Sequence, residues 1–235
     1  MPVMEIREVH LEAPAGCIEE LGSFYANLLG LVKVAGGDTA VAVGTSRLRW
    51  QAADGARKPF YHFALLVPGH RFRAAREWLS KRVDLLPRNG DPVVTFEAWN
   101  ALAVYFHDPA GSIVELIAHL DIEGTGPRIG AFHGSELLGV SEIGLVLQDK
   151  RAAATALQKQ VSVEVWPATS DLALDDPDDL AFVGRKAHTL ILAPPGRGWL
   201  PTARPAEAHP VEVVLAGTGS SGCVSLPGEV MVRTG

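Results

Sequence analysis

The feature that most constrains the fold of this chain is an order of elements that occurs twice in its first 120 residues. Each unit has a strand of alternating residues, a break, a helix with one apolar face, and three short strands. The predicted strands are 5–13, 32–34, 39–43 and 47–52, then 60–67, 92–99, 101–106 and 112–119, with helices over 18–29 and 72–83. A β-α-β-β-β repeat of about 50–60 residues indicates an internally duplicated fold. We therefore predict an α+β protein in which paired βαβββ modules form a curved mixed sheet around a cleft.

The remainder of the chain predicts a weaker version of the same unit. Residues 121–138 contain glycine and proline and have no clear period, so we interpret them as a linker. A third unit follows, with a helix over 150–160 and strands over 140–148, 161–166, 180–184 and 188–193, and a last strand over 209–216 could be the remnant of a fourth. We predict a two-module domain with a metal site over 1–120 and a degenerate domain without metal ligands over 139–235.

Composition excludes several classes of function. The formal net charge is −6 and no basic tail is present, which argues against nucleic acid as a partner. Cys17 and Cys223 cannot form a disulfide framework or a Cys-x-x-Cys motif, so we expect a cytoplasmic protein. No apolar run approaches the ~20 residues of a membrane span, and residues 1–5 do not open a signal peptide, so we expect no membrane partner.

Three side chains could carry chemistry because of their places in the repeat. His10 and His62 lie in the opening strands of the two units, 52 residues apart, and Glu115 lies in the last strand of the second unit. Strand alternation places each of them on the face opposite the apolar one, toward a cleft. Two imidazoles and one carboxylate form a metal-binding set that leaves coordination positions open for substrate or oxygen. Taken singly, each histidine could be a surface or packed residue, and Glu115 could face water.

Two stretches of this sequence are similar to a known superfamily. Residues 104–115, VYFHDPAGSIVE, resemble the closing strand-turn-strand of the vicinal oxygen chelate superfamily, and residues 24–31, FYANLLGL, resemble the end of its helix. That group includes glyoxalase I, fosfomycin-resistance enzymes, extradiol ring-cleaving dioxygenases and bleomycin-resistance proteins. The resemblance covers residues 5–119 well and 139–217 weakly. The turn is common to many members, so it identifies the superfamily better than the reaction.

The resemblance implies one divalent metal ion held by His10, His62 and Glu115, with iron(II) or manganese(II) first and zinc or nickel as alternatives. The fourth ligand usual in glyoxalase I falls on Arg49, which cannot ligate, so a three-ligand site is expected. Tyr105, ten residues before Glu115, matches the extradiol pattern and is the candidate acid, although the upstream histidine of that pattern is absent. Arg47 and Arg49 are candidate substrate-binding residues. The alternatives are that Tyr105 only fills space and that the arginines lie at a solvated strand end.

These observations predict a metal-dependent enzyme that chelates neighbouring oxygens of a small substrate, with an extradiol-type dioxygenase ahead of a glyoxalase-like lyase or isomerase. The alternative is a metal-free protein that sequesters a small molecule, which predicts an aromatic-rich cavity. The third unit offers Gly144 at the place of His10 and no counterpart of Glu115. The loop 196–201 could be a lid, although Trp199 could instead fill a hydrophobic seam. A homodimer is compatible with the superfamily, in which modules can pair within or between chains.

Overall fold

The computed structural model describes residues 4–122, 124 and 129–235. Residues 1–3, which open the segment considered for a signal peptide, and residues 123 and 125–128 of the predicted linker lie outside the described residues. Among the helices of the described part, none has the length and apolar character needed to cross a membrane.

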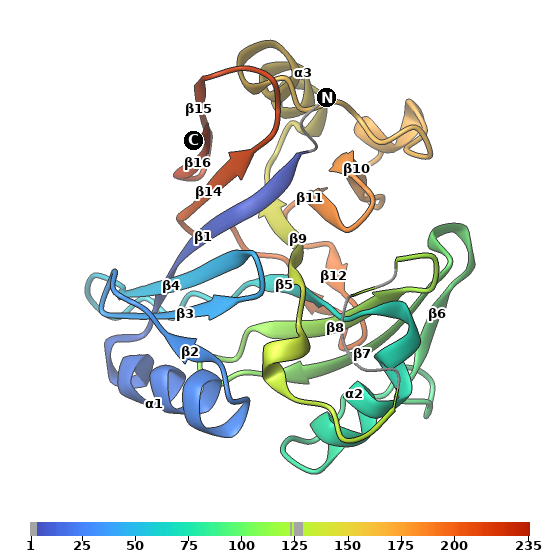
Figure 1. The fold of residues 1–235 in the computed structure, drawn as a ribbon. Coiled ribbons are helices and arrows are strands. Elements are labelled where there is room, and N and C mark those ends of the chain that lie inside the picture. Colours follow the sequence, from blue (N-terminus) through green and yellow to red (C-terminus); the bar gives the residue numbers. More distant parts are fainter. Residues whose placement is uncertain (1–3, 123, 125–128) are drawn as a thin grey trace.

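Two seven-stranded mixed sheets make up the fold, and each combines strands from two units (Figure 1). The strands of the first sheet are, in order across the sheet, β15 (Cys223–Leu226), β16 (Val230–Thr234), β14 (Val211–Ala216), β1 (Glu5–Ala13), β4 (Ser46–Ala52), β3 (Thr39–Val43) and β2 (Val32–Lys33). The strands of the second sheet are, in order, β10 (Ala181–Arg185), β11 (His188–Ala193), β9 (Gly139–Val146), β5 (His62–Leu66), β8 (Ile113–His119), β7 (Ala101–His107) and β6 (Val94–Phe96). A short hairpin, β12 (Gly198–Trp199) with β13 (Arg204–Pro205), stands apart from both sheets.

The prediction of paired βαβββ modules is confirmed, but the units pair differently from the expected order. The first unit shares its sheet with β14–β16 near the end of the chain, through β1 and β14. The second unit shares its sheet with the third, through β5 and β9. Residues 1–120 therefore do not form one sheet, and the boundaries drawn at 120 and 139 do not follow the sheets. The segment after 209 supplies three strands of a fourth unit, two more than the single strand predicted over 209–216.

The helices form where the sequence has a single apolar stripe, and each covers the outer face of a sheet. They are α1 (Ile18–Ser23), which continues as a π-helical turn over Phe24–Leu28, α2 (Phe72–Ser80) and α3 (Lys150–Val161). The Asp149 side chain accepts a hydrogen bond from the Ala152 N–H at 2.7 Å and so caps the start of α3. The predicted strand over 161–166 is wrong, because only an isolated bridge at Val165 joins this segment to β10.

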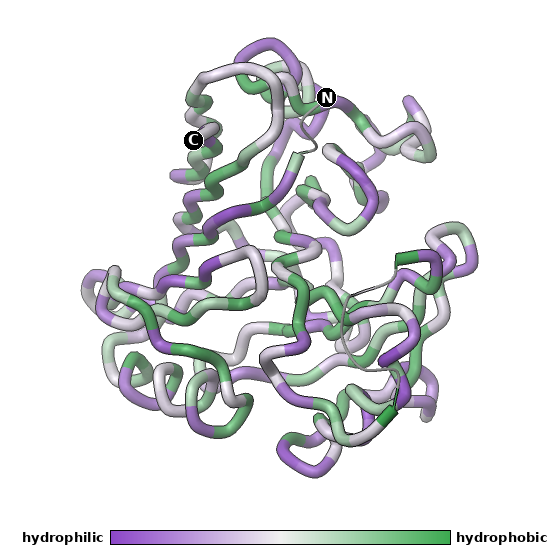
Figure 2. The backbone as a smooth tube through the Cα atoms, viewed as in Figure 1, coloured by the Kyte–Doolittle hydropathy of each residue, from purple (hydrophilic) through white to green (hydrophobic). Residues whose placement is uncertain are grey.

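Strand alternation separates two apolar layers. Val114, Leu116 and Ala118 face the main core between sheets and helices, whereas Ile113 and Ile117 belong to a second cluster on the opposite face of β8. Figure 2 shows hydrophobic residues along the interior strands and hydrophilic ones in the outer turns. Glu115 shares its face of β8 with Ile113 and Ile117, so the second cluster surrounds the ionisable side chains of the site described below.

Candidate metal centre in the second sheet

A pocket on the second sheet contains three buried ionisable side chains that come from three adjacent strands. His62 lies on β5, Glu115 on β8 and Glu142 on β9, and one ligand atom from each lies within 4.8 Å of the others. Within the described residues, this is the one group of histidine, cysteine and acidic residues with metal-binding geometry. Their exposed fractions are 6%, 2% and 7%, so all three are withdrawn from bulk water.

The strand register explains why the two glutamates meet. Ala64 on β5 is the register partner of Glu115 on β8 and also of Glu142 on β9. Neighbouring strands lie about 4.8 Å apart, and a methyl group at Ala64 leaves the space above it open. His62, two residues earlier on β5, points to the same face. The three side chains therefore converge over Ala64.

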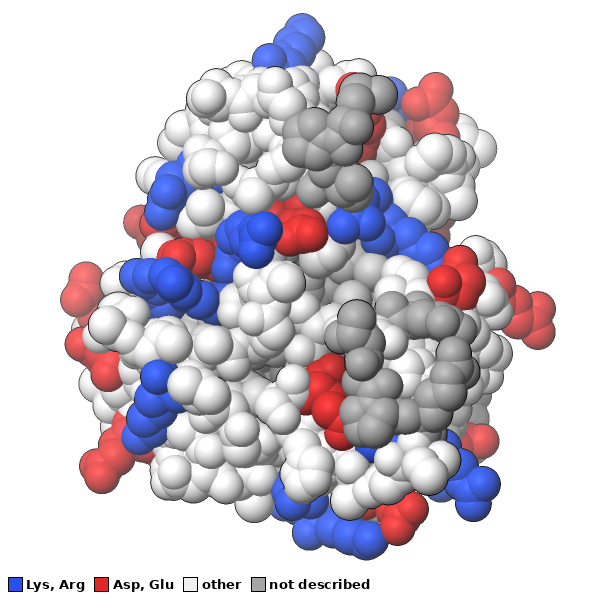
Figure 3. Space-filling model, viewed as in Figure 1, with Lys and Arg blue, Asp and Glu red and all other residues white. Residues whose placement is uncertain are grey.

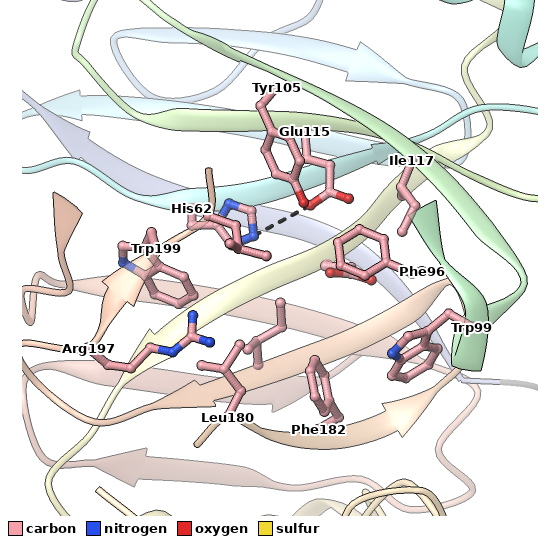
Figure 4. A pocket seen from close by; sticks show the side chains of 13 residues that line it. His62, Phe96, Trp99, Tyr105, Glu115, Ile117, Leu180, Phe182, Arg197 and Trp199 are labelled. Carbon is pink, nitrogen blue, oxygen red and sulfur yellow. Dashed lines mark ion pairs between the residues drawn. The ribbon is translucent and has the colours of Figure 1, made fainter. Parts of the chain in front are cut away.

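The hydrogen bonds of His62 define which of its nitrogens is available. Nδ1 lies 3.0 Å from the carbonyl oxygen of Ile113, and because a carbonyl can only accept, Nδ1 carries the proton. Nε2 then presents its lone pair toward Glu115, at 3.7 Å from Oε2 (Figure 4). Burial lowers the pKa of His62 to about 4, so the ring is neutral at pH 7. A neutral imidazole oriented by a backbone carbonyl is the form that binds metals.

The carboxylates are in an environment that disfavours their charge. Burial and the neighbouring Glu142 raise the pKa of Glu115 well above its usual range, although a hydrogen bond from Tyr105 opposes the shift. Burial likewise raises the pKa of Glu142. Glu115 Oε1 is buried without a hydrogen-bond partner among the described residues. A divalent cation would satisfy this oxygen and offset both negative charges, so the residues present fit a metal ion.

Tyr105 on β7 lies beside this cluster, opposite Glu115 in the ladder of β7 and β8. Its side chain is 1% exposed and its ring faces His62 with 6.3 Å between ring centroids. Burial and the negative charges of Glu115 and Glu142 raise the pKa of Tyr105 well above its usual range, so the hydroxyl keeps its proton. The hydroxyl is therefore placed to donate a hydrogen bond or a proton within the pocket.

Among the described residues, Arg197 is the one cationic side chain of the pocket wall (Figure 4). The rest of the wall is aromatic and aliphatic, and is lined by Phe96, Trp99, Ile117, Leu180, Phe182, Ile191, Trp199 and Leu200. Trp99 contacts Phe182 edge-on at 5.2 Å, and Trp199 packs on His62 at 4.9 Å between ring centroids. The centres of water-sized groups can occupy about 100 Å³ of the pocket, several times what one water needs. Trp199 therefore lines the pocket. Its ring fills the space beside His62, which corresponds to the hydrophobic seam predicted from the sequence.

His10 lies on the first sheet and is not part of this group. Its Nε2 is 2.9 Å from Glu8 and its Nδ1 is 3.3 Å from Glu212 on β14. Arg47 and Arg49 also lie there, and each has a nitrogen 3.2 Å from a Glu8 oxygen. The expected convergence of His10, His62 and Glu115 is therefore corrected, because β1 and β5 belong to different sheets. Figure 3 shows side chains of both signs in the region of β1 and β4.

The two sheets differ at equivalent positions of the ladder. On the first sheet His10 is the register partner of both Arg49 and Glu212, as Ala64 is of Glu115 and Glu142 on the second. Arg49 thus occupies the place of Glu115. The Arg49 guanidinium supplies a positive charge at this position of the first sheet. On the second sheet, the same level of the ladder holds two buried acids, Glu115 and Glu142, without a cationic side chain of this kind among the described residues.

Glu142 is the residue that sequence reasoning missed. The comparison of opening strands considered only Gly144, two residues further along β9, and concluded that the third unit has no ligand. The available signal was the one that identified Glu115, a single glutamate within an apolar strand, here Gly139–Val146, of which every residue is buried.

Comparison with known proteins supports the fold. No protein-family model and no curated sequence matches the chain. Among solved structures, a provisionally assigned dioxygenase from Bacillus subtilis subsp. subtilis strain 168 is similar, with 14% identity, a TM-score of 0.62, and 99% of this chain and 86% of that one covered. Glyoxalase I from Zea mays is similar with 13% identity, a TM-score of 0.56, and 98% and 92% covered, and its V278E variant gives a TM-score of 0.57.

These similarities extend over nearly the whole chain and over most of each compared protein. The chain therefore shares its fold, the vicinal oxygen chelate fold, with these glyoxalase and dioxygenase structures. At such low identity the likeness concerns the fold alone, so the activity has to be argued from the pocket.

Proposed function

We propose that this protein is a metal-dependent enzyme that binds a small molecule through two neighbouring oxygens at His62, Glu115 and Glu142. The observation that carries the proposal is the convergence of these three buried side chains, with an unsatisfied carboxylate oxygen, in an otherwise apolar pocket. Carboxylate and imidazole ligands suit manganese(II) and iron(II), with zinc and nickel as alternatives. Three protein ligands leave positions for substrate and for oxygen, so ring-cleaving oxygenation ranks first and a glyoxalase-like isomerisation second.

Each residue has a distinct role in this proposal. A divalent ion in the site would polarise the substrate oxygens and stabilise the negative charge that develops on them. His62 is oriented by the Ile113 carbonyl, and Trp199 shields its exposed side. The Tyr105 hydroxyl, which keeps its proton, would donate to a substrate oxygen beside Glu115. The aromatic walls would exclude water and so strengthen each of these interactions.

The test is a titration of the metal-free protein with manganese(II), followed by calorimetry. We expect one ion per chain, with affinity at least about tenfold lower in Glu142→Gln, since even residues that only support a ligand matter by about 10–100-fold. Glu212→Gln is the matched control, because Glu212 has the equivalent ladder position on the first sheet, and it should bind as the wild type does. Failure of the wild type to bind manganese(II), iron(II) or zinc would overturn the proposal.

A second candidate is a protein that sequesters an aromatic molecule without converting it. The observation in its favour is the aromatic lining of the pocket, with Phe96, Trp99, Phe182 and Trp199 on its walls. Iron(II)-loaded protein mixed with catechols under air separates the two candidates. Consumption of dioxygen supports the oxygenase, and binding by either the loaded or the metal-free protein without any chemical change of the bound molecule supports sequestration.

A further inference from the structure

Arg197 lies in the pocket and forms no ion pair with an acidic side chain among the described residues, although Asp179 acts on it from further away. The hairpin residue lines the same wall as Trp199 and Leu200, and Figure 4 shows its guanidinium turned inward, on the side away from Tyr105 and Glu115. The one hydrogen bond that its side chain makes within the described part of the chain is from Nη1 to the Gly198 carbonyl at 2.8 Å. No carboxylate of the described residues lies within 4.0 Å of it. An arginine has five N–H donors, so most of them remain available to a ligand.

Hydrogen bonds within the hairpin, and contacts from the hairpin to the second unit, fix the backbone that carries Arg197. Gly196 N–H donates to Ala206 and Ala206 N–H donates to Arg197, each at 2.8 Å. Arg204 on the returning strand donates to the Gly111 carbonyl at 2.9 Å and lies over the Phe60 ring. The position of Arg197 is therefore set before a ligand arrives, which reduces the entropy lost on binding.

When the proposed ion is bound, the acidic residues that line the pocket with Arg197 would be balanced by the ion, and Asp179 acts on the guanidinium only from a distance. Glu115 and Glu142 together would balance the two charges of a divalent cation. The pocket lining other than Arg197 and the cluster is aromatic or aliphatic, and it includes Phe182 and Leu180. A guanidinium in such surroundings favours a ligand that brings one negative charge and two acceptor atoms.

We infer that Arg197 holds an anionic group at the far end of the substrate, so that the substrate class is a small, apolar, flat organic anion, such as a carboxylate, that presents neighbouring oxygens to the opposite side of the pocket. This inference rests on the proposed function only for the end of the substrate that carries the two neighbouring oxygens. The anionic end depends on Arg197, and the aromatic side chains that line the pocket, Trp99 and Phe182 among them, would contact the body of the substrate.

The test compares two probes that differ by one carboxylate, 3,4-dihydroxybenzoate and catechol, on manganese(II)-loaded protein. We expect 3,4-dihydroxybenzoate to bind about 10–100-fold more tightly, as a charge-assisted hydrogen bond allows. In Arg197→Gln this preference should fall to about onefold, while catechol binds as before. Arg197→Lys should retain part of it, and Arg73→Gln, an exposed change of the same charge on α2, should retain all of it.

The outcomes are distinguishable from those of the metal titration. If manganese(II) binds but the carboxylate gives no preference, or the preference survives in Arg197→Gln because the carboxylate binds the ion itself, the inference is overturned and the proposed function stands. If manganese(II) does not bind, the proposed function fails, and benzoate against benzamide on the metal-free protein then tests Arg197 alone. Equal binding of those two probes by the wild type would overturn the inference.

Discussion

Glu115 and Glu142 are separated in the sheet by a single residue, Ala64, with which both are in register. A larger side chain at this position would stand between the two carboxylates. We expect Ala64→Leu to weaken manganese(II) binding at least about tenfold and to lower the free energy of unfolding by about 1–3 kcal/mol through overpacking. Calorimetry and urea unfolding measure the two effects.

Two variants control for overpacking at Ala64. Ala118→Leu places the same side chain on the opposite face of β8, in the main core, and should lower stability without changing metal affinity. Ala64→Gly leaves the space open and should retain the metal, with a loss of about 0.5–1 kcal/mol. If Ala64→Leu binds manganese(II) as the wild type does, the ion does not lie above Ala64.

Gly144 leaves room for the indole that packs on His62. A Cβ at this position would lie 2.7 Å from Trp199 Cη2, so Gly144→Ala has to displace the ring. We expect a loss of about 1–3 kcal/mol in unfolding free energy and a change in the near-ultraviolet circular dichroism. Gly16→Ala, with nothing within 4 Å of the added Cβ, should change neither. An unaltered spectrum in Gly144→Ala would show that the Trp199 ring is not held there.

His188 should make the protein sensitive to acid, because it joins strands of both sheets. Its Nδ1 accepts from the Ile6 N–H of β1 at 3.3 Å, which requires the neutral ring. Burial, and then the charge of Arg185, lowers the pKa of His188 from 6.5 to about 4. A depressed histidine pKa stabilises the fold above pH 6.5, and this contribution is lost as the pH falls toward 4.

The corresponding measurement compares wild type with His188→Gln by urea unfolding between pH 7 and pH 4. The difference in unfolding free energy should change by up to about 3 kcal/mol in favour of the variant as the pH falls. Parallel curves over this range would contradict the assignment of a neutral His188.

A buried ion pair fastens residues 130–136 to the start of α2. Arg71, 2% exposed, has Nε 2.8 Å from Glu136 and donates to the carbonyls of Gly130 and Ala131. Arg71→Leu should cost about 3–5 kcal/mol because it leaves a carboxylate without its partner. The double variant Arg71→Leu/Glu136→Leu should cost less than the sum of the single changes, as a double-mutant cycle would show. Additive losses would mean that the two side chains do not interact.

Local structure was largely predictable from sequence, because alternation and apolar stripes depend on neighbouring residues. Strand β11 begins and ends as predicted at His188 and Ala193, and β8 presents Glu115 on the predicted face. The pairing of units was not predictable in the same way. Whether β1 lies beside β5 or β14 depends on contacts between residues some 200 apart, and every unit offers a similar opening strand.

The candidate site shows the same division. His62, Glu115 and Tyr105 all belong to one unit, and the structure brings them together. His10 was placed with them only through the assumption that consecutive units share a sheet. Glu142, which completes the cluster, comes from the third unit, which the sequence predicts to be degenerate. Only the register of β9 against β5 shows that Glu142 lies beside Ala64, at the same ladder position as Glu115.

The nesting of the two sheets along the chain has a consequence for biosynthesis. All strands of the second sheet lie between residues 62 and 193, whereas the first needs β1 together with strands that end at Thr234. A ribosome emits the chain from its amino end, so the sheet with the candidate metal centre can close while β1 still lacks its neighbour β14. During that interval one edge of β1 has no paired strand, so it can pair with an incorrect strand. A chaperone that covers this edge until β14 is synthesised would prevent such mispairing.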